Sequence, residues 1–240
     1  MAWTIIQQDN GAWLSQTQQE GNAVEVYNAL SALGWSFLAI CGALGNMTHE
    51  SGGINPGACE RGRGIPNAGS VHYGGGLGLI QWTDYPQPYT GTYNHPLLWN
   101  AERLHQPWYS GNFQCTLLNL ATDPTATDCD EGLGALWGWA TSSSYPSLGF
   151  NEYKSVSGRT PEEVAVIFFY CMESHGFDDG TIPSRQRYAR YWYDYLLGGQ
   201  PEPPTPEPPD PDPDPPVPVV READKHKWVY YLPHPNFIHP

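Results

Sequence analysis

The sequence predicts a mainly helical domain of the α+β class with one short strand region. Apolar residues recur at three- and four-residue steps from Phe37 to Thr48, which places them on one helix face. Residues 160–163 combine an N-cap threonine, a proline at the first helical position and a capping-box glutamate. Residues 74–83 begin with three glycines and continue as an apolar run that contains Gly78, which is typical of a strand that another group approaches closely.

The first half of the chain predicts two helices behind a leader. Residues 1–21 are polar and rich in glutamine, and we expect an N-terminal extension there. Residues 22–33 form an amphipathic pattern that begins with Asn22 as its cap. The next helix begins after Ser36 and ends before the Gly52-Gly53 pair.

The second half predicts further helices. Residues 97–104 and 112–120 read as two short helices, and the pattern that opens at Thr160 continues to His175. The last helix ends at Gly198 and has an aromatic face typical of a buried core, formed by Tyr188, Tyr191, Trp192 and Tyr195. The interval 121–158 is irregular and gives no prediction.

The composition changes abruptly after the last helix. Positions 201–220 hold eleven prolines and five acidic residues. Proline at this density favours an extended rod of about 3.1 Å per residue, or roughly 60 Å in total, so residues 200–220 are predicted to be a linker. Residues 221–240 are too short to fold alone and are expected to be an attachment segment that adds a strand to a partner, or the start of another domain.

Charge and residue spacing exclude several classes of function. The net charge is −14, and residues 1–200 hold 8 basic against 18 acidic residues, which argues against binding of nucleic acid or anionic membranes. No apolar stretch has the length of a membrane span, and the N-terminus lacks a secretory signal, so synthesis in a cytoplasm is expected. The histidines and cysteines have no metal-ligand spacing, so neither a metal nor another cofactor is expected.

The cysteines divide into two groups. Cys41 and Cys171 fall on apolar helix faces and are expected in the core. Cys59, Cys115 and Cys129 lie in or near expected loops, and a disulfide among them stays an alternative whose pairing the sequence does not determine.

Glu50 is the candidate catalytic acid. It lies three residues beyond Met47 and therefore leaves the last helical turn from near the buried face. The negative end of the helix and partial burial both disfavour the charged form, so we expect a pKa raised toward the range of a general acid. Gln81 and Thr83 are expected on one strand face with Trp82 on the other, and such groups suit a carbohydrate cleft.

These residues resemble a known family. The segments Asn46–Gly52, Asn55-Pro56 and Gly78–Thr83 are similar to the phage tail lysozyme domain and, more distantly, to lytic transglycosylases and goose-type lysozymes. Phe169–Glu173 and Arg187–Ala189 match more loosely, and the resemblance covers residues 20–198. It implies a lysozyme-like helical domain over residues 22–199, with a small β-sheet lining the cleft.

The resemblance implies cleavage of the β-1,4 bond between N-acetylmuramic acid and N-acetylglucosamine in peptidoglycan. Glu50 would protonate the leaving oxygen, and the second carboxylate is expected to be Asp84, then Glu173. In a third possibility Glu50 acts alone, as in lytic transglycosylases. The expected substrate-binding residues are Ser51, Gln81, Trp82, Thr83, Tyr85 and Glu173. Glu173 has an alternative, which is an ion pair with Arg185, Arg187 or Arg190 on the next helix.

The resemblance also implies a place of action. We expect a virion protein of the phage tail tip that degrades the host cell wall during entry and contacts other tail proteins through its two end segments. Two other classes stay open. A cysteine peptidase or amidase needs a thiol nucleophile beside a histidine, and a non-catalytic structural or wall-binding module would suit the acidic charge and the linker.

Overall fold

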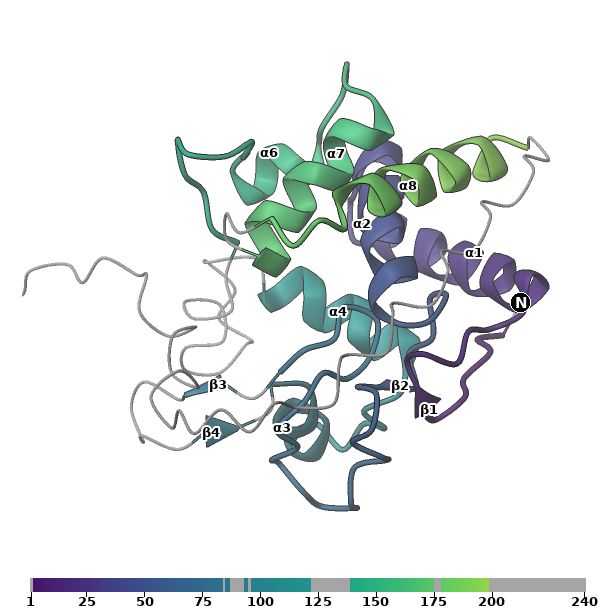
Figure 1. The fold of residues 1–240 in the computed structure, drawn as a ribbon, viewed down its shortest axis with the longest axis vertical. Coiled ribbons are helices and arrows are strands. Elements are labelled where there is room, and N and C mark those ends of the chain that lie inside the picture. Colours follow the sequence, from purple (N-terminus) through teal and green to yellow (C-terminus); the bar gives the residue numbers. More distant parts are fainter. Residues whose placement is uncertain are drawn as a thin grey trace, which may run out of the picture. The chain divides into compact units, whose positions relative to one another are not determined.

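The structure is a computed structural model that describes residues 2–83, 85–86, 93–94, 96–121, 139–174 and 178–198. Helices dominate this part of the chain and the strands are short (Figure 1), so the predicted mainly helical α+β class is confirmed. The predicted linker and attachment segment, residues 200–240, lie outside the described residues. No helix in the described ranges is both long and apolar enough to cross a membrane.

Helix α2 (Phe37–Glu50) is the central element of the helical part. It packs against α1 (Gln16–Ala32), α7 (Pro161–Phe168) and α8 (Ile182–Leu196), and Figure 1 shows it among these helices. All residues from Ala39 to Thr48 are buried. A helix that is apolar all round is expected in a core rather than on a surface.

Two glycines allow the neighbouring helices to approach α2 closely. A Cβ atom on Gly45 would lie 2.5 Å from the carbonyl oxygen of Arg185 in α8. A Cβ atom on Gly42 would lie 2.7 Å from a methyl carbon of Val164 in α7. Because real Cβ atoms do not come this close to other atoms, the helix spacing depends on glycine at both positions.

Helix α1 begins earlier than its predicted start at Asn22. Ser15 is the N-cap, and its side chain and that of Gln18 form a reciprocal capping box. The prediction is therefore wrong, because this local cap begins the helix within the polar leader. Asn22 is buried inside the helix, and its Nδ2 donates to the Thr4 carbonyl oxygen at 2.7 Å.

The strands form two pairs. β1 (Gln8–Asp9) runs parallel to β2 (Ala58–Cys59), with Gln8 opposite Ala58. β3 (Tyr85–Pro86) runs antiparallel to β4 (Tyr93–Asn94), with Tyr85 opposite Asn94. Isolated bridges join Cys59 to Leu77, and Leu77 to Trp82.

Residues 77–82 form a tight turn where a strand was predicted. Leu77 and Trp82 exchange backbone hydrogen bonds of 2.9 and 3.0 Å, and the chain turns through Gly78 (φ 77°) and Gln81 (φ 50°). The predicted sharing of one strand face by Gln81 and Thr83 is therefore wrong. The expected close approach at Gly78 is confirmed, because a Cβ atom there would lie 2.5 Å from the side chain of Gln114.

Four of the remaining helices follow the predicted positions: α3 (Pro96–Arg103), α4 (Gly111–Ala121), α7 and α8. Helix α6 (Phe150–Lys154) lies in the interval 121–158, where no element was predicted. The capping box of α7 is confirmed, with the Thr160 amide donating to Glu163 Oε2 at 2.8 Å. After α7 the chain continues as a π-helix, η1 (Phe169–Ser174), rather than as more α-helix.

Candidate functional site

Glu50 is the last residue of α2, as predicted. Ser36 caps the start of the helix and Ser51 is its C-cap residue. The Glu50 side chain is 21% exposed, so solvent and ligands reach it. Asn10 Nδ2 donates to the Glu50 carbonyl oxygen at 3.2 Å and to Gln81 Oε1 at 3.1 Å. The turn that carries Gln81 is thereby held beside the end of α2.

Arg185 of α8 forms an ion pair with Glu50. Its Nη2 donates to Glu50 Oε1, and the arginine side chain is only 3% exposed. Its Nη1 donates to Asn46 Oδ1 at 2.9 Å, and its Nε donates to Thr181 Oγ1 at 2.8 Å. The sequence does not predict an arginine partner for Glu50, because the two residues lie 135 positions apart.

Asn46 and Phe169 fix the position of the guanidinium group. Asn46 is fully buried, and its Nδ2 donates to the carbonyl oxygens of Gly42 at 2.9 Å and Ala165 at 3.1 Å. The guanidinium carbon of Arg185 lies 4.5 Å from the centroid of the Phe169 ring, a cation–π contact. The side chain is therefore held from several directions before any ligand binds.

Glu173 of η1 is a second carboxyl group in this cluster. Burial raises the pKa of Glu173 well above its usual value; the charges of Glu50 and Asp179 raise it further, and Arg185 lowers it. Its Oε1 is buried and has no hydrogen-bond partner among the described residues. Arg185 and Arg190 form ion pairs with Glu50 and Glu162, and the alternative of an ion pair between Glu173 and an arginine of α8 stays a prediction.

The predicted substrate-binding roles of Ser51 and Trp82 need correction. Ser51 is fully buried; its Oγ donates to the Met47 carbonyl oxygen at 2.7 Å and accepts from the Asn55 amide at 3.0 Å, which closes the end of α2. Trp82 is also fully buried, because the turn directs it into the core, so its ring offers no face to a sugar.

The other predicted site residues fall into two groups, those that the structure describes and those that it does not. Gln81 is partly exposed and lies beside Glu50 through Asn10, and Thr83 is exposed. Asp84 and the side chain of Tyr85 lie outside the described residues, so their roles stay predictions.

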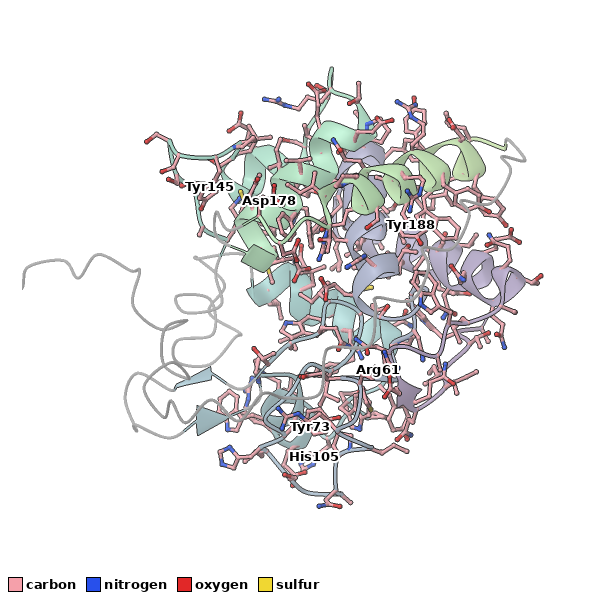
Figure 2. All side chains as sticks on the ribbon, viewed as in Figure 1. Arg61, Tyr73, His105, Tyr145, Asp178 and Tyr188 are labelled. Carbon is pink, nitrogen blue, oxygen red and sulfur yellow. The ribbon has the colours of Figure 1, made fainter. Side chains whose placement is uncertain are left out.

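A pair of tyrosines borders the cluster. The rings of Tyr145 and Tyr170 stack with centroids 5.4 Å apart, and both residues are partly exposed. Burial, and then the charges of Asp178 and Asp179, raise the pKa of Tyr170. Asp179 Oδ2 lies 4.0 Å from Arg185 Nη2, and Figure 2 shows Tyr145 and Asp178 in the same region, near α6. Sequence reasoning missed this pair because Tyr145 lies in the interval without a predicted element.

The cluster contains carboxyl groups in two different environments. Glu50 pairs with Arg185 and is partly exposed, whereas burial and the charge of Glu50 raise the pKa of Glu173. Two carboxyl groups whose environments separate their protonation states are the arrangement that acid–base catalysis uses.

A family model described as phage tail lysozyme matches residues 21–196. The chain belongs to the phage tail lysozyme family.

The predicted resemblance is thus confirmed, and the matched span contains Asn46, Glu50, Glu173 and Arg185. Members of the phage tail lysozyme family are phage lysozyme-like hydrolases of the cell wall. The chain is also 42% identical over 72 residues to Morphogenesis protein 1 of Bacillus phage B103. This similarity covers 30% of the chain and 18% of the relative, so the chain spans less than a fifth of that relative's length.

Proposed function

We propose that the chain cleaves the β-1,4 bond between N-acetylmuramic acid and N-acetylglucosamine in peptidoglycan, with Glu50 as the general acid. The observation that carries this proposal is the partly exposed Glu50 carboxyl at the end of α2, fixed by a buried arginine in a phage tail lysozyme domain. A general acid must reach its substrate while its own geometry stays fixed. The support from Arg185 and Asn46 meets the second condition.

Tyr145 and Tyr170 supply the aromatic surface that the fully buried Trp82 does not. Sugar rings pack their apolar faces on aromatic side chains, and neutral hydrogen-bonding groups read their hydroxyls. The partly exposed Gln81, beside the end of α2, is suited to the second task.

Transglycosylation on the same bond is the second candidate reaction. Hydrolysis uses a second ionised carboxylate as nucleophile or as base for water. Glu173 is less suited to either task, because burial and the charge of Glu50 raise its pKa and disfavour its ionised form. Asp84 remains the proposed second carboxylate. If Asp84 has no catalytic role, the 6-hydroxyl of the muramoyl residue replaces water and an anhydro sugar forms.

Burial disfavours a cysteine peptidase that uses Cys41, Cys115 or Cys171. It raises the pKa of Cys41 to about 12, that of Cys115 to about 12 and that of Cys171 to about 11. The thiolate is the nucleophile in such enzymes, and these groups stay thiols at neutral pH. All three are buried free cysteines, as is Cys59.

We place the enzyme on the virion, where it degrades the host cell wall locally during entry from the tail tip. The family match supports a virion protein that acts on the wall. The two end segments, residues 1–21 and 221–240, are proposed to contact other tail proteins. An enzyme that a tail delivers needs no long-range attraction to an anionic wall, which suits the net charge of −14.

The test is mass spectrometry of soluble products from purified peptidoglycan. Glu50→Gln should reduce product formation by about 100- to 10,000-fold, the usual cost of a lost general acid. Glu162→Gln is the matched control, because Glu162 also pairs with an arginine of α8 but lies outside the cluster; it should stay within about twofold.

The products separate the candidate functions. New reducing muramic ends that disappear in Glu50→Gln support hydrolysis, whereas anhydro ends support transglycosylation. Near-normal activity in Glu50→Gln would overturn the assignment of the acid. Freed stem peptides, or no product from several wall types, would point instead to a peptidase or a wall-binding module.

A further inference from the structure

We propose that Glu173 stores the proton that Glu50 delivers to the leaving oxygen. The role in catalysis rests on the function proposed above, whereas the stored proton is a property of the folded protein alone. Glu173 would act on the substrate through Glu50, so it is a positioning and proton-holding residue rather than the residue that meets the substrate.

The ion pair of Glu50 with Arg185 is the first part of the arrangement. Arg185 directs its Nη2 at Glu50, while its Nη1 and Nε are used by Asn46 and Thr181. In this ion pair Glu50 is the carboxylate partner of an arginine side chain that is 3% exposed. A carboxylate has no proton to give, so the resting pair by itself does not supply a general acid.

The buried carboxyl group of Glu173 is the second part of the arrangement. Glu173 Oε1 is buried and receives no hydrogen bond in the described part of the chain. An ionised oxygen in such a place loses its hydration without compensation, which is costly. The charged groups that face Glu173 are Glu50 of α2, Arg185 of α8 and Asp179 before α8. A second negative charge beside Glu50 is unfavourable, so Glu173 is the group of this pair that keeps the proton.

The transfer balances without any further reactant. The O–H bond of Glu173 breaks, and an O–H bond forms on Glu50 in place of its hydrogen bond to Arg185. The proton then passes from Glu50 to the glycosidic oxygen as the bond from that oxygen to the sugar carbon breaks. Glu173 remains as a carboxylate balanced by the positive charge of Arg185. The oxygen of a water, or of the muramoyl 6-hydroxyl in transglycosylation, then bonds to the sugar carbon, and the proton that this oxygen releases returns to Glu173.

The backbone at Glu173 agrees with a functional role. Glu173 lies in η1, and short π-helical segments occur frequently at functional sites. The first residue of the same segment, Phe169, packs on the guanidinium group of Arg185. The segment therefore fixes both Glu173 and the cation that receives its charge after transfer.

Infrared spectroscopy of the full chain at pH 7 tests the stored proton without any substrate. The wild type and the control Glu162→Gln should both show the absorption of one protonated carboxyl group. Glu173→Gln should lose it, and Glu50→Gln should retain it because burial alone favours the neutral form of Glu173. Absence of the band in the wild type, its survival in Glu173→Gln, or its loss in Glu50→Gln would overturn the proposal.

The pH dependence of activity then tests the catalytic role. Glu173→Gln removes the carboxyl group that stores the proton, so the alkaline limit of activity should fall to lower pH in this variant. Above that limit, each unit of displacement reduces the rate about tenfold. A profile of unchanged shape and lower amplitude would indicate a structural role and refute the relay. If the band behaves as expected but no wall is cleaved, the proposed function fails and the stored proton stands.

Discussion

Helix α8 carries two arginine–glutamate pairs that differ in environment. Arg190 binds Glu162 with two hydrogen bonds, Nε to Oε1 at 2.7 Å and Nη2 to Oε2 at 2.9 Å, and the side chains are 41% and 30% exposed. Arg185 binds Glu50 through Nη2 and is 3% exposed. The same residue types, five positions apart on one helix, thus form an exposed ion pair, here called the surface clamp, and an ion pair whose arginine is buried.

The difference lies in what else each carboxyl group meets. Burial alone would raise the pKa of Glu162, but the hydrogen bonds from Arg190 outweigh it and hold that pKa below its usual value. Both carboxylate oxygens of Glu162 accept hydrogen bonds from Arg190. The pair therefore joins α7 to α8 and is poorly placed to transfer a proton. Glu50 instead accepts one hydrogen bond from a buried arginine, and its charge raises the pKa of a second carboxyl group, Glu173.

Loss of the buried arginine should have the largest effect on stability. Arg185→Met leaves Glu50 without its cation and Asn46 Oδ1 without its donor. Removing one partner of a buried ion pair costs about 3–5 kcal/mol. Urea denaturation should therefore show a much lower midpoint than for Arg190→Met, which should lose about 0.2–1 kcal/mol, and less at high salt. Equal losses in the two variants would remove the distinction between the pairs.

A methyl group between α2 and α8 should have an intermediate effect. The Cβ atom of Gly45→Ala would lie 2.5 Å from the Arg185 carbonyl oxygen and 2.8 Å from Ala189 Cβ. Overpacking of this kind costs about 1–3 kcal/mol. Gly21→Ala in α1 meets no atom within 4 Å and should stabilise by about 0.5–1 kcal/mol. Thermal unfolding of both variants checks this, and a stable Gly45→Ala would show that α8 moves without cost.

The surface clamp should have the smallest effect, and that effect should depend on pH. The pKa of Glu162 lies below its ordinary value of 4.5, so the unfolded chain binds more protons than the folded chain in the window below 4.5. The stabilisation is fully present above that value and is lost as pH falls. Glu162→Gln should cost about 0.2–1 kcal/mol near neutral pH and nothing in strong acid. A difference that grew in acid would contradict the assigned direction.

Local signals were sufficient to predict the end of α2 and the start of α7. Ser36, Gly52 and the capping box at Thr160 each act within a few residues, and the sequence pattern contains them completely. The helix position of Glu50 follows from the same signals. Helix α1 had such a signal as well, in Ser15 and Gln18, but its first turn is polar and apolar periodicity does not detect it.

The partners of Glu50 depend on long-range packing that periodicity does not encode. Three arginines follow one another on α8 within six positions, and only the spacing of α2 and α8 at Gly45 selects Arg185. The burial of Trp82 has a similar cause. Two residues with left-handed backbone angles, Gly78 and Gln81, convert an expected strand into a turn, and the indole of Trp82 lies in the core.

The π-helical turn of η1 makes the direction of Glu173 depend on chain length. A π-turn contains one residue more than an α-turn, and each residue of an α-helix turns a side chain by about 100° and advances it by about 1.5 Å. Deleting one residue between Phe168 and Glu173 would restore an ordinary helix and rotate the carboxyl group away from Arg185. Relatives that differ by one residue here would keep every residue type of the cluster and lose its arrangement, so changes in length matter for this cluster as much as substitutions.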